Sequence, residues 1–448
     1  MKLLRLLLSA IVCLPVVAMG YQVREGQVDD SAYYPSTVHR YTVTIPEGYD
    51  PLQGAALYVG LDGILCNAPE RIDSLIATGD IPPMIGVFIE PGIVYDDNGE
   101  VLRYNRSCEF DAPDGRFARF LEQELLPEAL KDINILPGGE NAMIFGLSSG
   151  GIAAFNAAWQ RPDLFGRVYS GCGTFVPMRG ADELQSWVRK TEPRDIKVFL
   201  QDGFSDTWNP LFGSWYEANR LLGSALEFAG YDCAFDWAEG GHSVRRSSQI
   251  FPEVMKWLWG KHDAKTTGNS TMAPYLEEAG EWISTPTTGN FEARTGAVYP
   301  GGSHVAEAVD GSNYLWQYLL RADGSRYAGQ PFYWLHSMEN RTLRLGGMSF
   351  DNNGNLWVVT DAGIQVCDQN GRVRAILRLP LELEKALIDN RGANPLRGSL
   401  LDIAEGEIRI TTQLTTYARK LNIHPGHNAP QIARPRLNQK RRAISTRP

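Results

Sequence analysis

The sequence predicts an α/β fold, in which a doubly wound, mostly parallel sheet is followed by a smaller all-β part. Three observations predict it. Between about Tyr41 and Trp259, short β-rich runs alternate with amphipathic helical patterns. The strands in the second half of that stretch are apolar throughout, as in a sheet that is covered on both faces. After Lys261 helical periodicity gives way to short β-like runs separated by Gly, Asn and Asp turns.

Each predicted element has the composition of its type. The strands are short and rich in Val, Ile, Phe and Tyr, whereas the helical runs space their apolar residues three or four positions apart. The predicted strands cover residues 40–46, 55–61, 84–90, 142–147, 167–172, 196–201 and 233–238. The predicted helices cover residues 116–130, 152–159, 215–230 and 247–260.

The first twenty residues have the layout of a cleavable export signal. Lys2 and Arg5 give a positive start, an apolar core follows, and Ala18 and Gly20 are small residues at its exit. A single membrane anchor is the alternative, although the apolar run is short beside the ~20 residues that span a bilayer. We therefore expect a secreted or periplasmic protein with no membrane contact once the signal is cleaved.

Composition and pattern set the domain organisation and limit the partners. The chain has 448 residues, of which 43% are hydrophobic, and its net charge of −9 argues against nucleic acid as a partner. We expect a signal peptide at 1–20, an α/β domain at 21–262 and a linker at 263–293. A partial β-propeller-like domain at 294–427 and a basic, disordered tail at 428–448 follow.

Five cysteines remain after the predicted cleavage. An exported protein can form disulfides, and Cys66 with Cys108 is one candidate pair. Buried free thiols are the alternative.

A glycine-flanked serine stands between an apolar run and a helical run, in Gly146-Leu147-Ser148-Ser149-Gly150. A nucleophilic serine on a sharp strand-to-helix turn needs glycine two positions before and after it, because larger side chains would collide with the neighbouring strand and helix. The following helix directs N–H groups and the positive end of its dipole at the same place. Ser148 is therefore the predicted nucleophile; a tight turn without chemistry is the alternative.

A serine hydroxyl needs a base, and in this fold the chain order is serine, acid, histidine. His242 lies after the last predicted strand, in AEGGHSVRR, and is the predicted base. The acid is expected after the strand at 196–201, where Asp206 is favoured over Asp202, and Glu239 is a third candidate. Its task is to hold the imidazole in the right tautomer and to stabilise its cation.

Two backbone N–H groups are expected to hold the oxyanion. The first belongs to Ser149, directly after the nucleophile. The second comes from the Asp62-Gly63-Ile64 turn that follows an early strand, where Ile64 and Gly63 are both candidates.

Several blocks in order, including LDG, YNRSCEFD, FGLSSGG and LEFAGYDCAFDWAEGGHS, resemble the Putative esterase family of α/β-hydrolases. That family includes esterase D-like, feruloyl, acetylxylan and enterochelin esterases. The resemblance covers about Thr37 to Gly260. It implies Ser148 as nucleophile, Asp206 as acid and His242 as base.

The resemblance also implies substrate contacts. Arg106, in a stretch similar to the family's Arg-x-x-Glu-Tyr-Asp, is a candidate to grip a substrate carbonyl or anionic group, and Asp62 is a further candidate contact. A brace between Arg106 and Glu109 or Asp111 is the structural alternative. Trp208 and Trp215 are candidates to line an acyl pocket, with core packing as the alternative.

The segment from about Thr295 to Leu379 resembles part of the gluconolactonase propeller family. Where that family has Asp-Gly-Met with a metal-binding aspartate, this chain has Gly346-Gly347-Met348. A hard divalent cation needs several oxygen ligands. We therefore expect no metal site and no lactonase activity here, and instead an accessory or substrate-covering role.

The sequence as a whole predicts an exported serine esterase that works through an acyl-enzyme and needs no cofactor. The expected substrates are small-molecule or oligosaccharide esters carrying acetyl or feruloyl groups. An enterochelin-type siderophore esterase is one alternative, encouraged by Arg103, Arg106, Arg245 and Arg246. A non-catalytic binding module on a relic hydrolase fold is an alternative of another class.

Overall fold

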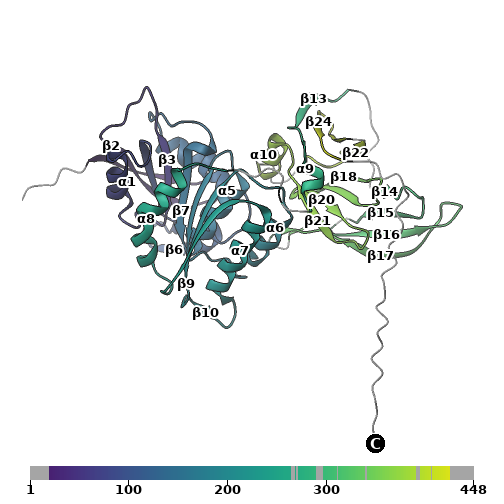
Figure 1. Ribbon diagram of the computed structural model, residues 1–448, viewed down its shortest axis with the longest axis horizontal. Helices are drawn as coiled ribbons and strands as arrows, with labels where there is room; N and C mark the ends of the chain where they lie inside the picture. The colour runs from purple at the N-terminus through teal and green to yellow at the C-terminus, as the bar shows by residue number, and fades with distance from the viewer. Residues whose placement is uncertain are drawn as a thin grey trace, which may run out of the picture.

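The computed structural model describes residues 20–263, 268, 271–288, 296–309, 311–338, 341–389, 394–404 and 406–423. Figure 1 shows two parts side by side, a twisted sheet carrying helices and a group of smaller β-sheets. The predicted signal peptide, apart from Gly20, and the predicted tail lie outside the described residues. Within the described ranges, no helix is both long enough and apolar enough to span a membrane.

The large sheet is mixed but mostly parallel. Antiparallel additions extend one side: β2 (Val38–Pro46), β1 (Tyr21–Asp29), β5 (Ile93–Tyr95) and β6 (Val101–Tyr104). Parallel strands end at the same edge of the sheet, so the loops that follow them gather there. Six strands pair in parallel in the order β12 (Asp232–Ala238), β9 (Lys197–Gly203), β8 (Arg167–Gly171), β7 (Ala142–Leu147), β3 (Ala56–Leu61) and β4 (Met84–Ile89).

Two hydrophobic cores lie on opposite faces of this sheet, because successive strand residues point to opposite sides. Val59 and Ile144 belong to one core, and their chain neighbours Tyr58 and Phe145 belong to the other. The fold is the predicted α/β-hydrolase arrangement. Helices α5 (Ser149–Gln160) and α7 (Trp215–Ala229) pack on the first core, and α1 (Ala68–Ala77) and α8 (Val244–Trp259) pack on the second.

One predicted helix has a different form. The run at 116–130 is divided into α3 (Arg116–Phe120), a π-helical turn η1 (Leu121–Leu125) and α4 (Leu126–Ala129). Pro127 lies in this run, and proline lacks the N–H that would continue the helical hydrogen bonds. Some short elements leave no clear pattern in the sequence and are not predicted from it. They are the strands β1, β5, β6, β10 (Trp208–Asn209) and β11 (Gly213–Ser214), and the helices α1, α2 (Arg106–Phe110), α6 (Leu184–Lys190), η2 (Gly139–Asn141) and η3 (Ala181–Glu183).

The C-terminal part contains three four-stranded antiparallel sheets among the described residues, which confirms a second, all-β part. Its propeller-like character stays a prediction. The first sheet is β14 (Gly296–Val298), β15 (His304–Ala308), β16 (Tyr314–Leu320) and β17 (Arg326–Trp334). The second is β18 (Leu345–Phe350), β19 (Leu356–Thr360), β20 (Gly363–Cys367) and β21 (Val373–Leu377), which α10 (Leu381–Asp389) follows. The third is β13 (Ile283–Pro286), β24 (Thr415–Lys420), β23 (Glu407–Thr411) and β22 (Leu400–Ala404).

The segment expected as a linker at 263–293 carries structure of its own. It contains α9 (Ala273–Leu276), and its strand β13 pairs with β24. A Thr- and Ser-rich strand of this kind forms through pairing with a distant segment and leaves little periodic signal in its own sequence. The expectation of a plain linker is therefore wrong for these residues.

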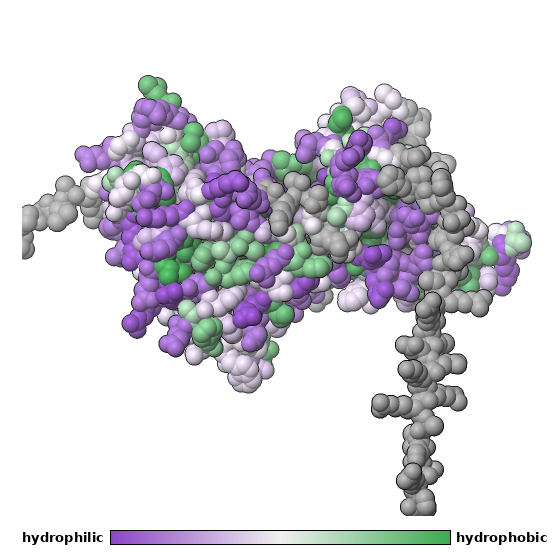
Figure 2. Space-filling model, viewed as in Figure 1, coloured by the Kyte–Doolittle hydropathy of each residue, from purple (hydrophilic) through white to green (hydrophobic). Residues whose placement is uncertain are grey.

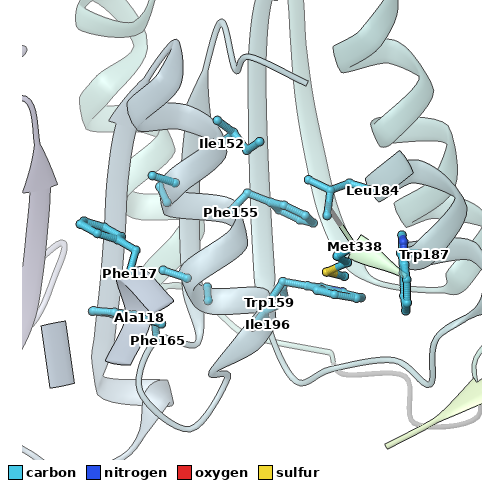
Figure 3. Close-up of a cluster of buried hydrophobic side chains, with 14 of the residues drawn as sticks. Phe117, Ala118, Ile152, Phe155, Trp159, Phe165, Leu184, Trp187, Ile196 and Met338 are labelled. Atoms are coloured by element: carbon cyan, nitrogen blue, oxygen red, sulfur yellow. The ribbon is translucent and has the colours of Figure 1, made fainter. Parts of the chain in front are cut away.

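The two parts are packed against each other. Glu192 accepts hydrogen bonds from Arg419 Nη2 and Nη1 at 2.7 and 2.9 Å, and Thr191 forms a β-bridge with Ile376. Met338 lies beside Trp159 in a core that both parts share (Figure 3). On the face shown in Figure 2, hydrophilic residues predominate and a band of hydrophobic residues crosses the α/β part.

Candidate active site

Ser148 occupies the turn between β7 and α5. Its φ and ψ are 56° and −121°, a conformation that a non-glycine residue adopts only under strain. A Cβ added at Gly146 would overlap the Gly150 carbonyl, and one at Gly150 would lie 2.8 Å from Asp62 Oδ2. Gly146 therefore permits the close approach of β7 and α5, and Gly150 leaves room for the Asp62 carboxylate.

His242 reaches Ser148 from the loop between β12 and α8. Its Nε2 lies 2.8 Å from Ser148 Oγ, and its Nδ1 lies 2.8 Å from Asp206 Oδ1. In the arrangement used by serine hydrolases, Nδ1–H donates to the acid, and Nε2 takes the serine proton. The structure thus joins the predicted nucleophile, base and acid in one hydrogen-bonded row.

Among the three candidate acids, Asp206 is the one that contacts His242 in the described structure. Burial opposes its ionisation, but hydrogen bonds from His242, Asp202 and the Thr207 N–H outweigh burial and lower the pKa of Asp206. Asp202 is fully buried behind it, and Glu239 is exposed on the loop.

The oxyanion candidates differ in availability. The Gly63 N–H donates to the Ile89 carbonyl at 2.9 Å, so the Gly63 alternative is not supported. In the described part of the chain, the N–H groups of Ile64 and Ser149 have no acceptor. Ser149 is the first residue of α5, where a helix offers no partner for the N–H. Ile64 and Ser149 are therefore the pair that remains.

Arg106 and Asp62 bind each other. Arg106 Nε lies 2.6 Å from Asp62 Oδ1, and its Nη2 lies 2.8 Å from Oδ2. The alternative brace from Arg106 to Glu109 or Asp111 does not form among the described residues, and Glu109 instead lies 2.9 Å from His39 Nε2. An arginine with both ends of its fork on a carboxylate has less capacity to grip a substrate.

The two tryptophans have different surroundings. Trp208 is 71% exposed, whereas Trp215 is buried, and its ring stands edge-on to His242 at 6.2 Å between centroids. Trp215 Nε1 donates to Thr174 Oγ1 at 3.2 Å, and that hydroxyl lies 3.3 Å from Ser148 Oγ. Trp215 therefore packs beside His242 and contacts Ser148 through the Thr174 hydroxyl. Thr174 was missed in the sequence because no local motif marks it.

An apolar cavity of about 230 Å³ lies close by. Phe175, which follows Thr174, and Ser214, which precedes Trp215, are among its lining residues. Leu184 and Leu222 add apolar surface, while Glu217 adds a carboxylate. The cavity is a candidate for an uncharged part of a ligand.

Cys172, Asp206 and His242 form the one group in the described ranges that could hold a metal ion. Burial raises the pKa of the Cys172 thiol to about 12, so the thiol is protonated at neutral pH and a weak ligand. His242 and Asp206 are already bound to each other. The donor set fits a hydrogen-bonded serine site better than a metal site. Cys66 and Cys108 are both free, so the candidate disulfide between them is wrong.

The chain is similar to one protein family and to several solved structures. The model of the Putative esterase family matches residues 36–305, which is more than half of the chain. No curated protein matches the chain. A ferulic acid esterase is 19% identical, with a TM-score of 0.43, over 53% of this chain and 98% of its own.

Two further solved structures are similar at the same level. The enterobactin esterase of Shigella flexneri is 20% identical, with a TM-score of 0.41, over 53% of this chain and 59% of its own. The feruloyl esterase module of Clostridium thermocellum is 13% identical, with a TM-score of 0.40, over 55% of this chain and 93% of its own. The match to the family model is what places the protein: the chain belongs to the Putative esterase family and is a carboxylic ester hydrolase.

Proposed function

We propose that the protein hydrolyses esters through a catalytic triad of Ser148, His242 and Asp206. The observation that carries the proposal is the row of two 2.8 Å contacts from serine to imidazole to carboxylate. Ser148, Asp206 and His242 come from three loops at one edge of the sheet, in the chain order of an α/β-hydrolase triad.

In the proposed reaction, His242 Nε2 takes the Ser148 proton while Oγ attacks the ester carbonyl. The N–H groups of Ile64 and Ser149 hold the developing oxyanion, an interaction worth ~2.7–4 kcal/mol per donor in comparable sites. His242 then gives its proton to the leaving alcohol, and an acyl-enzyme remains. Water, deprotonated by His242, releases the acid.

We infer an uncharged acyl ester of a carbohydrate, acetyl or feruloyl, as the substrate. Large apolar side chains are exposed beside each loop of the site: Ile64 at 50%, Phe204 at 54% and Val244 at 42%. The arginines that would attract a trianionic siderophore are largely engaged. Arg106 binds Asp62, Arg246 binds Asp236 at 2.7 Å through two nitrogens, and Arg103 donates to Asn105.

A siderophore triester is the second candidate, because Arg245 is exposed near His242. A panel of feruloyl sugars, acetylated sugars and a catecholate triester, measured at low and high salt, tests the choice. Efficient hydrolysis of the neutral esters with little salt dependence supports our proposal. Preference for the triester, lost as salt rises, would favour the siderophore.

Catalysis itself is tested by a fluorophosphonate probe. Stoichiometric labelling of wild-type protein at Ser148 supports the triad, and a relic binding module would remain unlabelled. The proposal includes export, from the charged, apolar and small-residue order of residues 1–20, and an accessory role for the C-terminal β part.

A further inference from the structure

Asp202 is a buried carboxyl group that the proposed mechanism does not use. It lies near the end of β9, four residues before Asp206, and is fully shielded from solvent. Its Oδ1 accepts the Gly203 N–H at 2.7 Å. Its Oδ2 is buried and, within the described structure, meets no donor from an amide or hydroxyl.

Asp206 likewise has one carboxylate oxygen without a donor among the described residues. Its Oδ1 accepts from His242 and from the Thr207 N–H, while its Oδ2 is also buried and meets no such donor. Each carboxyl group thus has one buried oxygen without a donor in the described structure, and the two groups are close enough for each to shift the pKa of the other. Two ionised carboxylates offer no donor to each other, so a hydrogen bond that satisfies both oxygens requires a proton on one of them.

The surroundings decide which carboxyl holds that proton. Asp206 faces two N–H donors, which stabilise an anion, whereas Asp202 faces one N–H and the Cys172 thiol. Burial, reinforced by the hydrogen bond to Asp206 and its negative charge, raises the pKa of Asp202 well above its usual range. A neutral Asp202 beside an ionised Asp206 satisfies every one of these groups.

Resting on the triad proposed above, we propose that Asp202 is a positioning residue, a neutral carboxylic acid whose O–H donates to Asp206 Oδ2. This bond satisfies the second oxygen of the triad acid and leaves Oδ1 directed at His242 Nδ1. Asp202 touches neither substrate nor reacting atoms, so it acts only through Asp206.

Two substitutions of similar size separate the roles of its O–H, its charge and its volume. Asp202→Asn keeps a donor for Asp206 Oδ2 and an acceptor for the Gly203 N–H. Asp202→Leu keeps the volume and removes both. We expect kcat of Asp202→Asn within about threefold of wild type, and kcat of Asp202→Leu about ten- to a hundredfold lower with KM little changed.

The pH profile distinguishes positioning from plain structural support. Because Asp202 carries no charge in this account, the acidic limb of kcat/KM keeps its place in Asp202→Asn. If Asp202 were ionised, Asp202→Asn would remove a negative charge near His242 and move the acidic limb of kcat/KM to lower pH. That result would overturn the proposal. Equal losses in Asp202→Asn and Asp202→Leu would overturn it as well.

Infrared difference spectroscopy on the full chain tests the proton without using activity. Wild type minus Asp202→Asn should show the carbonyl stretch of one protonated carboxylic acid at neutral pH, shifted in heavy water. Its absence refutes a neutral Asp202 even if the enzyme is active. If the band is present in a protein that hydrolyses no ester, the protonated Asp202 is supported and only the proposed function is refuted.

Discussion

Arg106 and Asp62, 44 residues apart in the chain, form a two-point ion pair beside the nucleophile turn. Asp62 and Gly63 both have positive φ, so the loop that carries Ile64 is held in a conformation that needs support. Arg106 Nη2 also lies 3.4 Å from the Leu147 carbonyl, just before Ser148. The pair therefore links the oxyanion loop to the end of β7.

Breaking this pair should slow catalysis more than it weakens the fold. We expect Arg106→Gln and Asp62→Asn each to lower kcat by about tenfold, because the Ile64 N–H loses its fixed position. The double variant should lose little more than either single variant, as expected for partners in one interaction. Additive losses in a double-mutant cycle on kcat would contradict the link.

Removing the nucleophile should abolish hydrolysis. Ser148→Ala is expected to lower kcat on a nitrophenyl butyrate by about 10⁴-fold or more, because no acyl-enzyme forms. Ser74→Ala, an exposed serine on α1, is the matched control and should keep wild-type activity. Circular dichroism and a melting curve establish that both variants are folded. Substantial turnover by Ser148→Ala would refute the triad.

Glu192 should matter for the packing of the two parts. It accepts two hydrogen bonds from Arg419 and one from the Arg378 N–H, and the side chains of Glu192 and Arg419 are each only 10% exposed. Glu192→Ala leaves a buried cation without its partner, so we expect a loss of about 3–5 kcal/mol in the free energy of unfolding.

The control for this change is Glu407→Ala. Glu407 binds Arg409 on the surface, where an ion pair contributes less than about 1 kcal/mol. Denaturant unfolding of both variants gives the comparison. Equal losses would mean that the Glu192 contact does not stabilise the junction.

His262 should make stability depend on pH. It lies between Asp195 and Asp232, with contacts of 2.8 and 2.9 Å. Hydrogen bonding to Asp195, only partly offset by burial, raises the pKa of His262. Because the folded value is the higher one, this stabilisation is complete below the unfolded value of about 6.5 and is lost as pH rises through the folded pKa.

The expected result is that His262→Gln lowers Tm by about 2–4 °C near pH 6 and by much less near pH 9. Thermal melts of variant and wild type at both values measure the difference. A loss that is larger on the alkaline side would reverse the sign and refute the assignment.

The sequence alone predicts the nucleophile and the tight turn that carries it. Gly146, Ser148 and Gly150 lie within five residues, and the steric reason for their spacing is contained in that one turn. The order of serine, acid and histidine, read against alternating strands and helices, predicted Asp206 and His242 because parallel strands end at one edge of the sheet.

What the sequence by itself determined is therefore the α/β fold and three positions whose meaning comes from short-range geometry and chain order. Only the tertiary structure decided that Arg106 binds Asp62, that the Gly63 N–H is already used, and that Asp202 lies against Asp206. It likewise decided that β13 belongs to a sheet with β24. These contacts depend on which segments become neighbours and on how far each carboxyl or N–H is removed from water, and neither is encoded in residues that are adjacent along the chain.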